Sequence, residues 1–264
     1  MSSMKMMFPK TFRFIAATLF AASLGAVPAV VNASGAELHL DKAPLQFDNA
    51  SLQNGAKLFV NYCLNCHSAS YVRYNRLQQI GLTDPQIRDN LLFTADKVGD
   101  LMKVALRRED AKQWFGAAPP DLSVVARARS GEFGTGADWI YTYLRKFYRD
   151  ESRPTGWNNT VFPNVGMPNV LWTLQGQQAA HFVDKTDEHG VTGKHLEKLE
   201  ISQAGKLSKE EFDEEVADLV SFIAWMGEPA QEMRQQIGLY VLAVLAVLAV
   251  LSYMLKRAFW KDVH

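Results

Sequence analysis

Cysteine is scarce in this chain, with only two among 264 residues, and no second pair of Cys or His residues lies at the short spacing of a metal site. A structural zinc site needs four ligands, so this scarcity argues against one. The two cysteines also lie outside any βαβ pattern, which excludes a thioredoxin-like redox motif. Internal repeats and low-complexity linkers are absent as well. The two cysteines must therefore be explained by their own spacing.

Both cysteines lie in the pentapeptide Cys63-Leu64-Asn65-Cys66-His67. A Cys-x-x-Cys-His run is typical of covalent attachment of a c-type haem. Two thiols three positions apart can each add to one vinyl group of the haem, and the adjoining histidine can then reach the iron on its proximal side. A plain disulfide is the alternative, but it would leave His67 without a role. The motif therefore predicts one covalently attached haem c.

The N-terminal segment has the pattern of a secretory signal peptide. Three basic residues lie among the first 13, and an apolar stretch covers residues 14–31. The small-residue sequence ending at Ala33 is an acceptable cleavage site, so we expect a signal peptide over residues 1–33 and a mature chain from Ser34. An uncleaved anchor is the alternative, which Pro28 and the Ala-rich composition disfavour. Export agrees with covalent haem attachment.

A second apolar segment lies near the C-terminus, over residues 237–255. It contains 19 residues and no charge, and as a helix it is about 28 Å long, close to the ~30 Å hydrocarbon core of a bilayer. Basic residues follow it at once, whereas only Arg234 lies close before it. The positive-inside rule then predicts a transmembrane helix, a cytoplasmic tail over 256–264, and an exported haem domain over 34–236.

This topology changes the meaning of the formal net charge of zero. The expected exported domain contains 27 acidic and 22 basic residues, a net charge of −5. Such a surface attracts cationic partners and repels nucleic acid. A simple contribution to solubility is an equally good interpretation of the charge.

The roughly 200 residues outside the membrane are enough for one buried core, and their periodicity predicts a mainly α fold. Between residues 178 and 206 the helical pattern weakens, and a small two-stranded excursion is expected there. Helices are expected over residues 51–62, from Thr83 or Asp84 to Leu92, over 97–108, from Asp138 onward, and from the capping box that begins at Ser208.

The sixth ligand of the iron decides the class of function. A five-coordinate haem binds gases or peroxide, whereas a methionine opposite the histidine raises the reduction potential and suits electron transfer. Met226 and Met233 lie too near the membrane segment, and Met102 falls on an expected amphipathic helix, where methionine usually fills the core. Met167 follows Gly166 and is flanked by prolines in a stiff loop, so it is favoured. Histidines of the 178–206 segment are a less suitable alternative.

Four segments spread over nearly the whole expected mature chain match one known family. They are Tyr62-Cys63-x-x-Cys66-His67-Ser68 with the following Tyr71-Val72-Arg73-Tyr74; Ala118-Pro119-Pro120-Asp121-Leu122-Ser123 with Arg127-Ala128-Arg129; Gly166-Met167-Pro168; and Trp225-x-x-Glu228-Pro229 with the apolar segment and its basic end. With these segments the chain resembles the cytochrome c1 family, the haem subunits of cytochrome bc1 complexes. The haem motif alone is widespread, but this combination is specific.

The resemblance implies the residues of the haem site: Cys63 and Cys66 as thioether anchors, His67 and Met167 as axial ligands, Pro120 packed near the haem, and Arg129 paired with a propionate. A guanidinium binds carboxylates through two hydrogen bonds, which supports the last assignment. Without the resemblance, a plain surface arginine would be the preferred interpretation of Arg129.

The resemblance also implies the function and the partners. The expected protein lies in a bacterial inner membrane, with its haem domain in the periplasm, beside a cytochrome b and a Rieske iron–sulfur protein. It takes one electron from the Rieske protein and passes it to a c-type cytochrome, with no substrate chemistry of its own. The segment 71–76 is a candidate border of the exposed haem edge. The alternatives are a cytochrome subunit of another membrane oxidoreductase, such as a terminal oxidase, or a haem peroxidase or gas sensor.

Overall fold

The computed structural model describes residues 38–186 and 192–261. Backbone contacts divide the chain into two units, Met1–Leu38 and His39–His264, and the second unit contains the elements described below. The expected signal peptide, residues 1–33, lies outside the described residues, as do the last three residues of the expected cytoplasmic tail.

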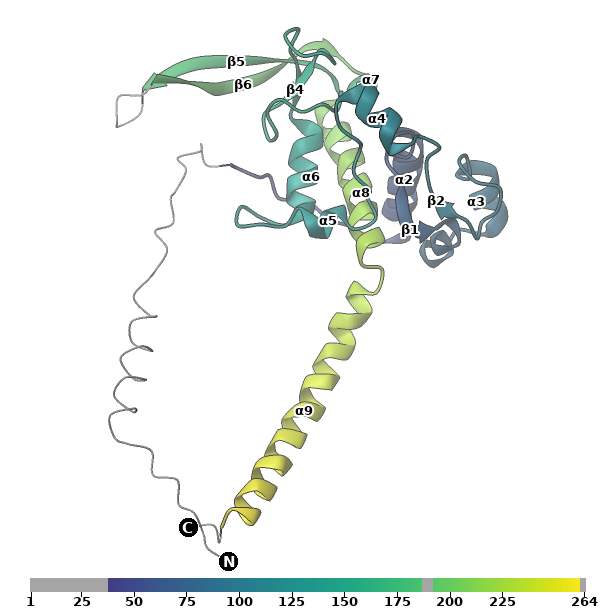
Figure 1. Cartoon of the computed structure of the whole chain (residues 1–264), viewed down its shortest axis with the longest axis vertical. Coiled ribbons are helices and arrows are strands. Elements are labelled where there is room, and N and C mark those ends of the chain that lie inside the picture. The colour runs from purple at the N-terminus through teal and green to yellow at the C-terminus, as the bar shows by residue number, and fades with distance from the viewer. Residues whose placement is uncertain (1–37, 187–191, 262–264) are drawn as a thin grey trace, which may run out of the picture. The chain divides into compact units, whose positions relative to one another are not determined.

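Helices dominate the described part of the chain, which confirms the predicted mainly α fold (Figure 1). The helices are α2 (Asn49–Leu58), η1 (Phe59–Cys63, a π-helix), η2 (Tyr74–Ile80, a 3-10 helix), α3 (Asp84–Asn90), α4 (Arg108–Phe115), α5 (Val125–Ala128), α6 (Gly136–Arg145), α7 (Trp172–Gln175), α8 (Lys209–Gly227) and α9 (Gln231–Phe259). Within the described residues the strands form antiparallel pairs: β1 (Ala69–Arg73) with β2 (Leu101–Met102), β3 (Phe147–Arg149) with β4 (Trp157–Asn159), and β5 (Gly176–Thr186) with β6 (Thr192–Ala204).

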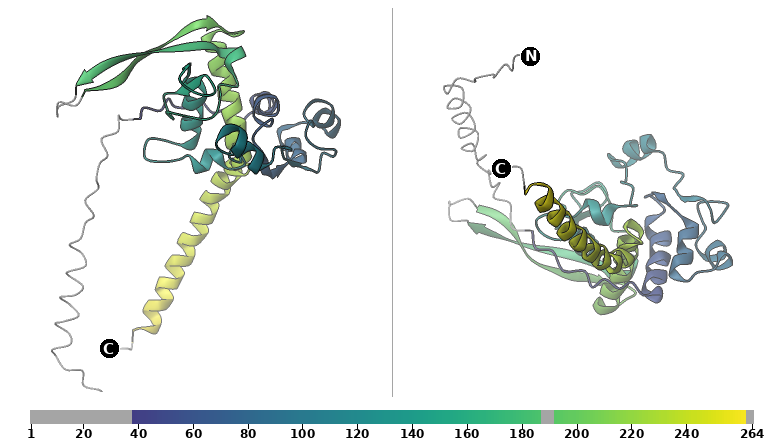
Figure 2. Two further views of the ribbon diagram at one scale, coloured as in Figure 1. Left: turned by 45° about the horizontal axis from the view of Figure 1, so that its top comes forward. Right: turned by 90° about the horizontal axis from the view of Figure 1, so that it is seen from below.

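The core is built around α8, which packs against α2, α5 and α6 (Figures 1 and 2). The ring of Phe222 in α8 lies 5.5 Å from that of Phe59 and 5.8 Å from that of Trp225, measured between centroids. Helix α2 can approach α8 closely because residue 55 is glycine, where a Cβ would clash with the backbone oxygen of Asp218. Since η1 continues α2 directly, this packing fixes where the chain reaches Cys63.

Capping boxes start three helices; the box at Ser208 and the N-cap at Thr83 agree with the sequence, whereas the box at Thr135 was not predicted. Thr83 caps α3, and Ser208 caps α8, where its hydroxyl and the carboxylate three residues on exchange hydrogen bonds with the backbone. Helix α6 begins at Gly136, two residues before the Asp138 expected to open it, because Thr135 is the N-cap. Sequence patterning therefore located these helices to within two residues.

The prediction of a helix over residues 97–108 was wrong. Leu101 and Met102 form strand β2, in which Met102 pairs with Ala69 of β1, and the next helix begins only at Arg108. Met102 is fully buried in a strand that pairs with the strand following the haem motif, and not on one face of a helix. Tertiary contacts here override the local pattern.

The two-stranded excursion expected between residues 178 and 206 is confirmed, and it is longer than the sequence indicated. Strands β5 and β6 pair from Gly176↔Ala204 to Thr186↔Thr192, and the hairpin is conspicuous in Figure 1. The side chains of His181 and His195 are exposed on it. They are therefore poor candidates for ligands of a buried iron.

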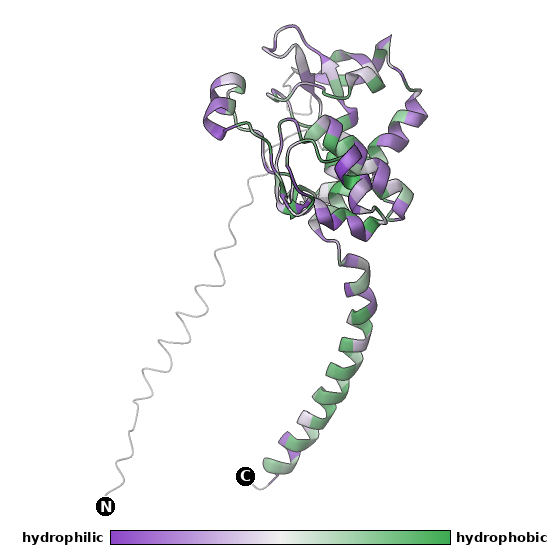
Figure 3. Ribbon diagram, turned by 90° about the vertical axis from the view of Figure 1, so that its right-hand side faces the viewer, coloured by the Kyte–Doolittle hydropathy of each residue, from purple (hydrophilic) through white to green (hydrophobic). Residues whose placement is uncertain are grey.

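Helix α9 has the length and composition of a membrane-spanning helix. The candidate membrane span is Met233–Phe259; its most apolar stretch has a mean hydropathy of 2.4 and is not buried, and Figure 3 shows the apolar residues along the helix. A core helix of a soluble protein would be covered by other elements. The expected transmembrane segment, residues 237–255, lies inside α9, which fits a single membrane anchor.

Candidate haem site

The cysteine motif forms a tight turn at the end of η1. The backbone N–H of Leu64 donates to the carbonyl of Phe59 at 2.9 Å, and the N–H of His67 donates to the carbonyl of Cys63 at 2.9 Å. Leu64 itself is fully buried and anchors the turn in the core. The π-helical turn, which sequence periodicity cannot reveal, is of a kind often found at functional sites.

Both thiols are free, with Cys63 buried and Cys66 exposed. Burial, with a smaller effect of the neighbouring Cys66, raises the pKa of Cys63 to about 12. A thiol in such surroundings is a poor thiolate nucleophile and a poor redox centre. The turn thus fits a covalent attachment point better than a catalytic or redox-active cysteine pair.

His67 is held by the backbone of Pro120. Its Nδ1 lies 2.8 Å from the Pro120 carbonyl oxygen, and a carbonyl can only accept, so Nδ1 carries the proton and Nε2 keeps its lone pair. Burial lowers the pKa of His67, against the opposite effects of the Pro120 carbonyl and the Asp121 carboxylate. A neutral imidazole with one oriented, free nitrogen is the form that binds a metal.

The segment that carries Pro120 is itself bonded to the chain that follows the haem motif. The Asp121 carboxylate accepts from the backbone N–H of Ser70 at 2.8 Å and of Ser123 at 2.9 Å, and the Leu122 N–H donates to the Ser68 carbonyl at 2.8 Å. Burial alone would raise the pKa of Asp121, but hydrogen bonds from the Ser123 hydroxyl and from the backbone N–H groups of Ser70 and Ser123 hold it below its ordinary value. These hydrogen bonds hold the Pro-Pro-Asp-Leu-Ser sequence beside the Cys-x-x-Cys-His motif.

Met167 lies in an irregular loop and is partly exposed. The hydroxyl of Tyr143 in α6 donates to its sulfur at 3.4 Å. Asparagines fix the loop on both sides: the Asn158 side chain accepts from the N–H of Asn164 at 2.8 Å, and Asn169 accepts from the N–H of Leu171 at 3.0 Å. These hydrogen bonds hold the loop in one conformation, with the partly exposed Met167 side chain beside Tyr143.

The other methionines fit a ligand role less well. Met102 is fully buried in β2 and Met226 is 4% exposed in α8, so neither sulfur can reach an added group without leaving the core. Met233 belongs to the apolar part of α9. Met167 remains the methionine that the fold leaves available.

Arg129 joins the Met167 side of the site through a group of aromatic rings. Its guanidinium carbon lies 4.4 Å from the ring centroid of Trp139 and 5.9 Å from that of Phe162, and Trp139 stacks on Tyr143 at 4.8 Å. Among the described residues Arg129 has no carboxylate partner, which leaves it free for one supplied from outside. Burial raises the pKa of Tyr143, against the effect of Arg129, so its hydroxyl stays a donor.

Sequence reasoning missed Trp139 and Tyr143. Their spacing of four residues places both on one face of α6, and this face meets the methionine loop through Phe162. The signal was present as two aromatics one helical turn apart, but only the tertiary structure shows that they adjoin the sulfur. For Pro120, the structure adds a hydrogen-bonding role of its carbonyl to the expected position near the haem.

These residues fit a c-type haem. Two free thiols, an imidazole with a free Nε2, a thioether and an arginine without a carboxylate match the vinyl, iron and propionate groups. No group of three or more His, Cys, Asp or Glu side chains within residues 38–186 and 192–261 is placed to hold a metal ion directly.

Comparison with known proteins agrees with this chemistry. The model described as "Cytochrome C1 family" matches residues 39–263. The chain is 46% identical to a protein named ammonia monooxygenase gamma subunit from Nitrosomonas europaea, over 90% of this chain and 94% of that protein. It is 45% identical to a cytochrome c1 from Allochromatium vinosum, over 90% and 95%. It is also 27% identical to a protein named cytochrome b/c1 from Bradyrhizobium diazoefficiens, over 83% of this chain and 34% of that one.

Proposed function

Because the chain belongs to the cytochrome c1 family, we propose that it is the haem-carrying subunit of a cytochrome bc1 complex and transfers one electron at a time. In this proposal Cys63 and Cys66 attach a single haem c, and His67 and Met167 bind its iron. The observation that carries the assignment is the 2.8 Å hydrogen bond from His67 Nδ1 to the Pro120 carbonyl, which leaves Nε2 for the metal.

When bound, a haem with histidine and methionine ligands supplies a one-electron couple of raised potential. The work of this chain is to keep both ligands still. Pro120 orients the imidazole, and Tyr143 orients the thioether. Ligands held by such bonds need not move when the charge at the iron changes, so little of the site has to rearrange on electron transfer.

Arg129 is proposed to pair with a haem propionate. The Trp139 and Phe162 rings hold its guanidinium in place, and a fixed guanidinium binds a carboxylate through two parallel hydrogen bonds. Its positive charge also disfavours the oxidised, more positive haem relative to the reduced haem, so Arg129 would add to the raised potential that Met167 produces. Both residues would therefore raise the driving force for reduction of the haem.

The partners proposed are a cytochrome b, a Rieske iron–sulfur protein as electron donor and a c-type cytochrome as acceptor. The relative named cytochrome b/c1, of which this chain covers 34%, supports a cytochrome b neighbour. Tyr71, 82% exposed just after the attachment site, supports the segment 71–76 as a border of the docking surface. The exposed carboxylates of Glu210, Glu211 and Glu214 at the start of α8 favour a basic acceptor.

In the proposed topology α9 crosses a bacterial inner membrane, with the haem domain in the periplasm and the basic end of the chain in the cytoplasm. The basic residues Lys256 and Arg257 in the last turn of α9 support this orientation. Protease added to intact spheroplasts should then degrade the haem domain. Protection of the haem domain until the membrane is opened would reverse the orientation.

The function is tested by extraction in mild detergent followed by identification of the proteins that co-purify. A cytochrome b and a Rieske protein should be recovered in equal amounts with this chain, and a quinol should reduce its haem through them. Recovery with ammonia monooxygenase subunits, as the name of one relative would suggest, or with a terminal oxidase, would contradict the proposal. A peroxidase or gas sensor would bind carbon monoxide at an open sixth position.

A further inference from the structure

A cavity of about 600 Å³ lies where the haem domain meets α9, and none of the residues proposed to hold the haem lines it. Its walls come from four elements: the residues before and within α2, η2, the end of α8, and the first turn of α9. The volume is within the range of small-molecule sites. Met233 lines the cavity and is also the first residue of the apolar part of α9. The cavity therefore opens at the level where lipid headgroups lie.

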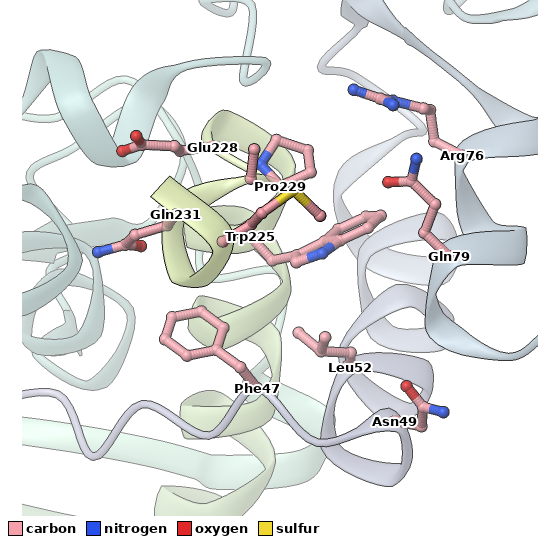
Figure 4. A pocket seen from close by; sticks show the side chains of 11 residues that line it. Phe47, Asn49, Leu52, Arg76, Gln79, Trp225, Glu228, Pro229 and Gln231 are labelled. Atoms are coloured by element: carbon pink, nitrogen blue, oxygen red, sulfur yellow. The ribbon is translucent and has the colours of Figure 1, made fainter. Parts of the chain in front are cut away.

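The lining combines an apolar floor with a polar rim. Figure 4 shows the Trp225 indole in the centre, Phe47 and Leu52 below it, and Arg76 and Gln79 of η2 to one side. Trp225 is fixed by stacking on Phe222. Indole rings with a polar edge are enriched at membrane–water interfaces.

The charge of the lining favours an anion. Arg76 and Glu228 are the charged residues that line the cavity. The Glu228 carboxylate is already paired, with Arg234 Nε at 2.6 Å and Arg127 Nη1 at 3.9 Å. Arg76 is exposed and forms no ion pair or hydrogen bond with another described residue. The uncompensated charge at the cavity is therefore positive.

From these observations we propose that the cavity binds the headgroup of an anionic glycerophospholipid of the adjoining leaflet. Arg76 binds the phosphate through two hydrogen bonds, Gln79 binds the glycerol backbone, and the acyl chains leave past Met233 along α9. A zwitterionic headgroup is disfavoured because the Glu228 carboxylate, which would face its ammonium group, is occupied by Arg234. The site takes no part in holding the haem, although Arg76 is the last residue of the segment 71–76, and it would anchor the domain at a fixed height above the membrane.

Native mass spectrometry of the complete complex in mild detergent tests the proposal. After removal of endogenous lipid, the complex is titrated with dioleoylphosphatidylglycerol, and dioleoylphosphatidylcholine and inorganic phosphate serve as competing probes. We expect Arg76→Gln to weaken phosphatidylglycerol binding about tenfold, the loss of one charge-assisted interaction. Gln79→Glu should also weaken it by placing a negative charge beside the phosphate. The matched control is Arg88→Gln in α3, where the arginine is exposed and outside the cavity.

Equal phosphatidylglycerol binding by Arg76→Gln and Arg88→Gln would overturn the proposal, as would equally tight binding of phosphatidylcholine. Displacement of the lipid by millimolar inorganic phosphate would show a free-phosphate site instead. If the cavity variants lost a protein subunit but kept the lipid, the cavity would be a protein interface. Lipid retention is measured without electron transfer. A failure of the lipid-binding proposal can therefore be distinguished from a failure of the proposed electron-transfer function.

Discussion

The Tyr143 hydroxyl donates a hydrogen bond to the Met167 sulfur. Through this contact Tyr143 can change the reduction potential of the proposed haem iron without binding it. A donor on the sulfur withdraws electron density from the proposed ligand and so favours the reduced haem. Tyr143→Phe should lower the reduction potential by up to about 40 mV, the equivalent of a net hydrogen bond of about 1 kcal/mol. Potentiometric titration of the purified protein measures the shift.

The matched control is Tyr141→Phe, a tyrosine on the same helix whose ring contacts the Arg145 guanidinium at 4.2 Å. Its potential should equal that of the unmodified protein. A rise in potential in Tyr143→Phe, or the same shift in both variants, would show that the hydroxyl does not act through the sulfur.

Asp121 links the stability of the haem site to pH. Its pKa lies below the ordinary value in the folded protein, so the carboxylate contributes stability that is present above the unfolded pKa of about 3.9 and is lost as pH falls through the folded pKa. Asp121→Asn should lower the Tm at pH 7, and the difference from the unmodified protein should shrink as the pH approaches 3. Melting curves followed at the haem absorbance measure this.

A Tm difference that stayed constant between pH 7 and pH 3 would show that the charge of Asp121 does not matter. Asp89→Asn is a suitable control, because that carboxylate is 67% exposed in α3 and pairs only with Arg88 beside it. Its effect on Tm should be small at every pH.

For single residues, the sequence was informative where the spacing of cysteines or the presence of glycine and proline in a loop indicates a structure. The Cys-x-x-Cys-His run predicts the attachment residues, and glycine and proline around Met167 indicate a stiff loop. Trp139 and Tyr143 could not be predicted, because their relation to the sulfur depends on how α6 packs against a loop more than 20 residues away. The role of the Pro120 carbonyl was equally hidden, since backbone atoms leave no signature in a sequence.

Among the elements, the contact of α2 with α8 determines where the haem motif begins. A side chain at position 55 would meet the backbone of Asp218, which cannot move aside as a side chain can. Gly55→Ala should therefore cost about 1–3 kcal/mol of unfolding free energy by overpacking, a fall in Tm of roughly 2–10 °C for a domain of this size. Thermal melting measured by circular dichroism checks it.

Gly99→Ala is the matched control for that substitution, because nothing lies within 4 Å of the added Cβ and the backbone there needs no positive φ. Its Tm should stay the same or rise slightly. If Gly55→Ala melted like Gly99→Ala, the close approach of the two helices would not be what positions the motif.

Helices could be predicted where residues at their N-terminus cap them. The structure of a segment could not be predicted where it depends on pairing with a strand far away in the sequence. In the capping boxes at Thr83 and Ser208, both hydrogen-bonding partners lie within four residues of each other in the sequence. The segment 97–108 has helical spacing of apolar residues, but Met102 is buried by pairing with β1 about 30 residues earlier in the chain. A pattern of apolar residues indicates that a segment is buried, but it does not indicate which other element the segment packs against.

At the scale of the whole molecule, the membrane helix, the haem domain and the acidic start of α8 divide the proposed function between them. Helix α9 limits diffusion to the plane of a membrane. Helix α8 packs against α2, which leads into the haem motif, and against α6, which places Tyr143 beside Met167. The sequence predicts such an organisation from length, hydropathy and charge, which are summed over many residues, and the apolar helix α9 agrees with the expected membrane segment. Local errors such as the one at 97–108 do not disturb such sums.

The most direct test of the central claim is the near-infrared absorption of the intact oxidised protein, where a methionine sulfur bound to ferric haem gives a weak charge-transfer band. We expect the band in the unmodified protein and in Met102→Leu, and its absence from Met167→Leu, which should still carry covalently bound haem. A band that persisted in Met167→Leu, or one that was lost in Met102→Leu instead, would contradict the assignment of Met167 and with it the proposed electron-transfer site.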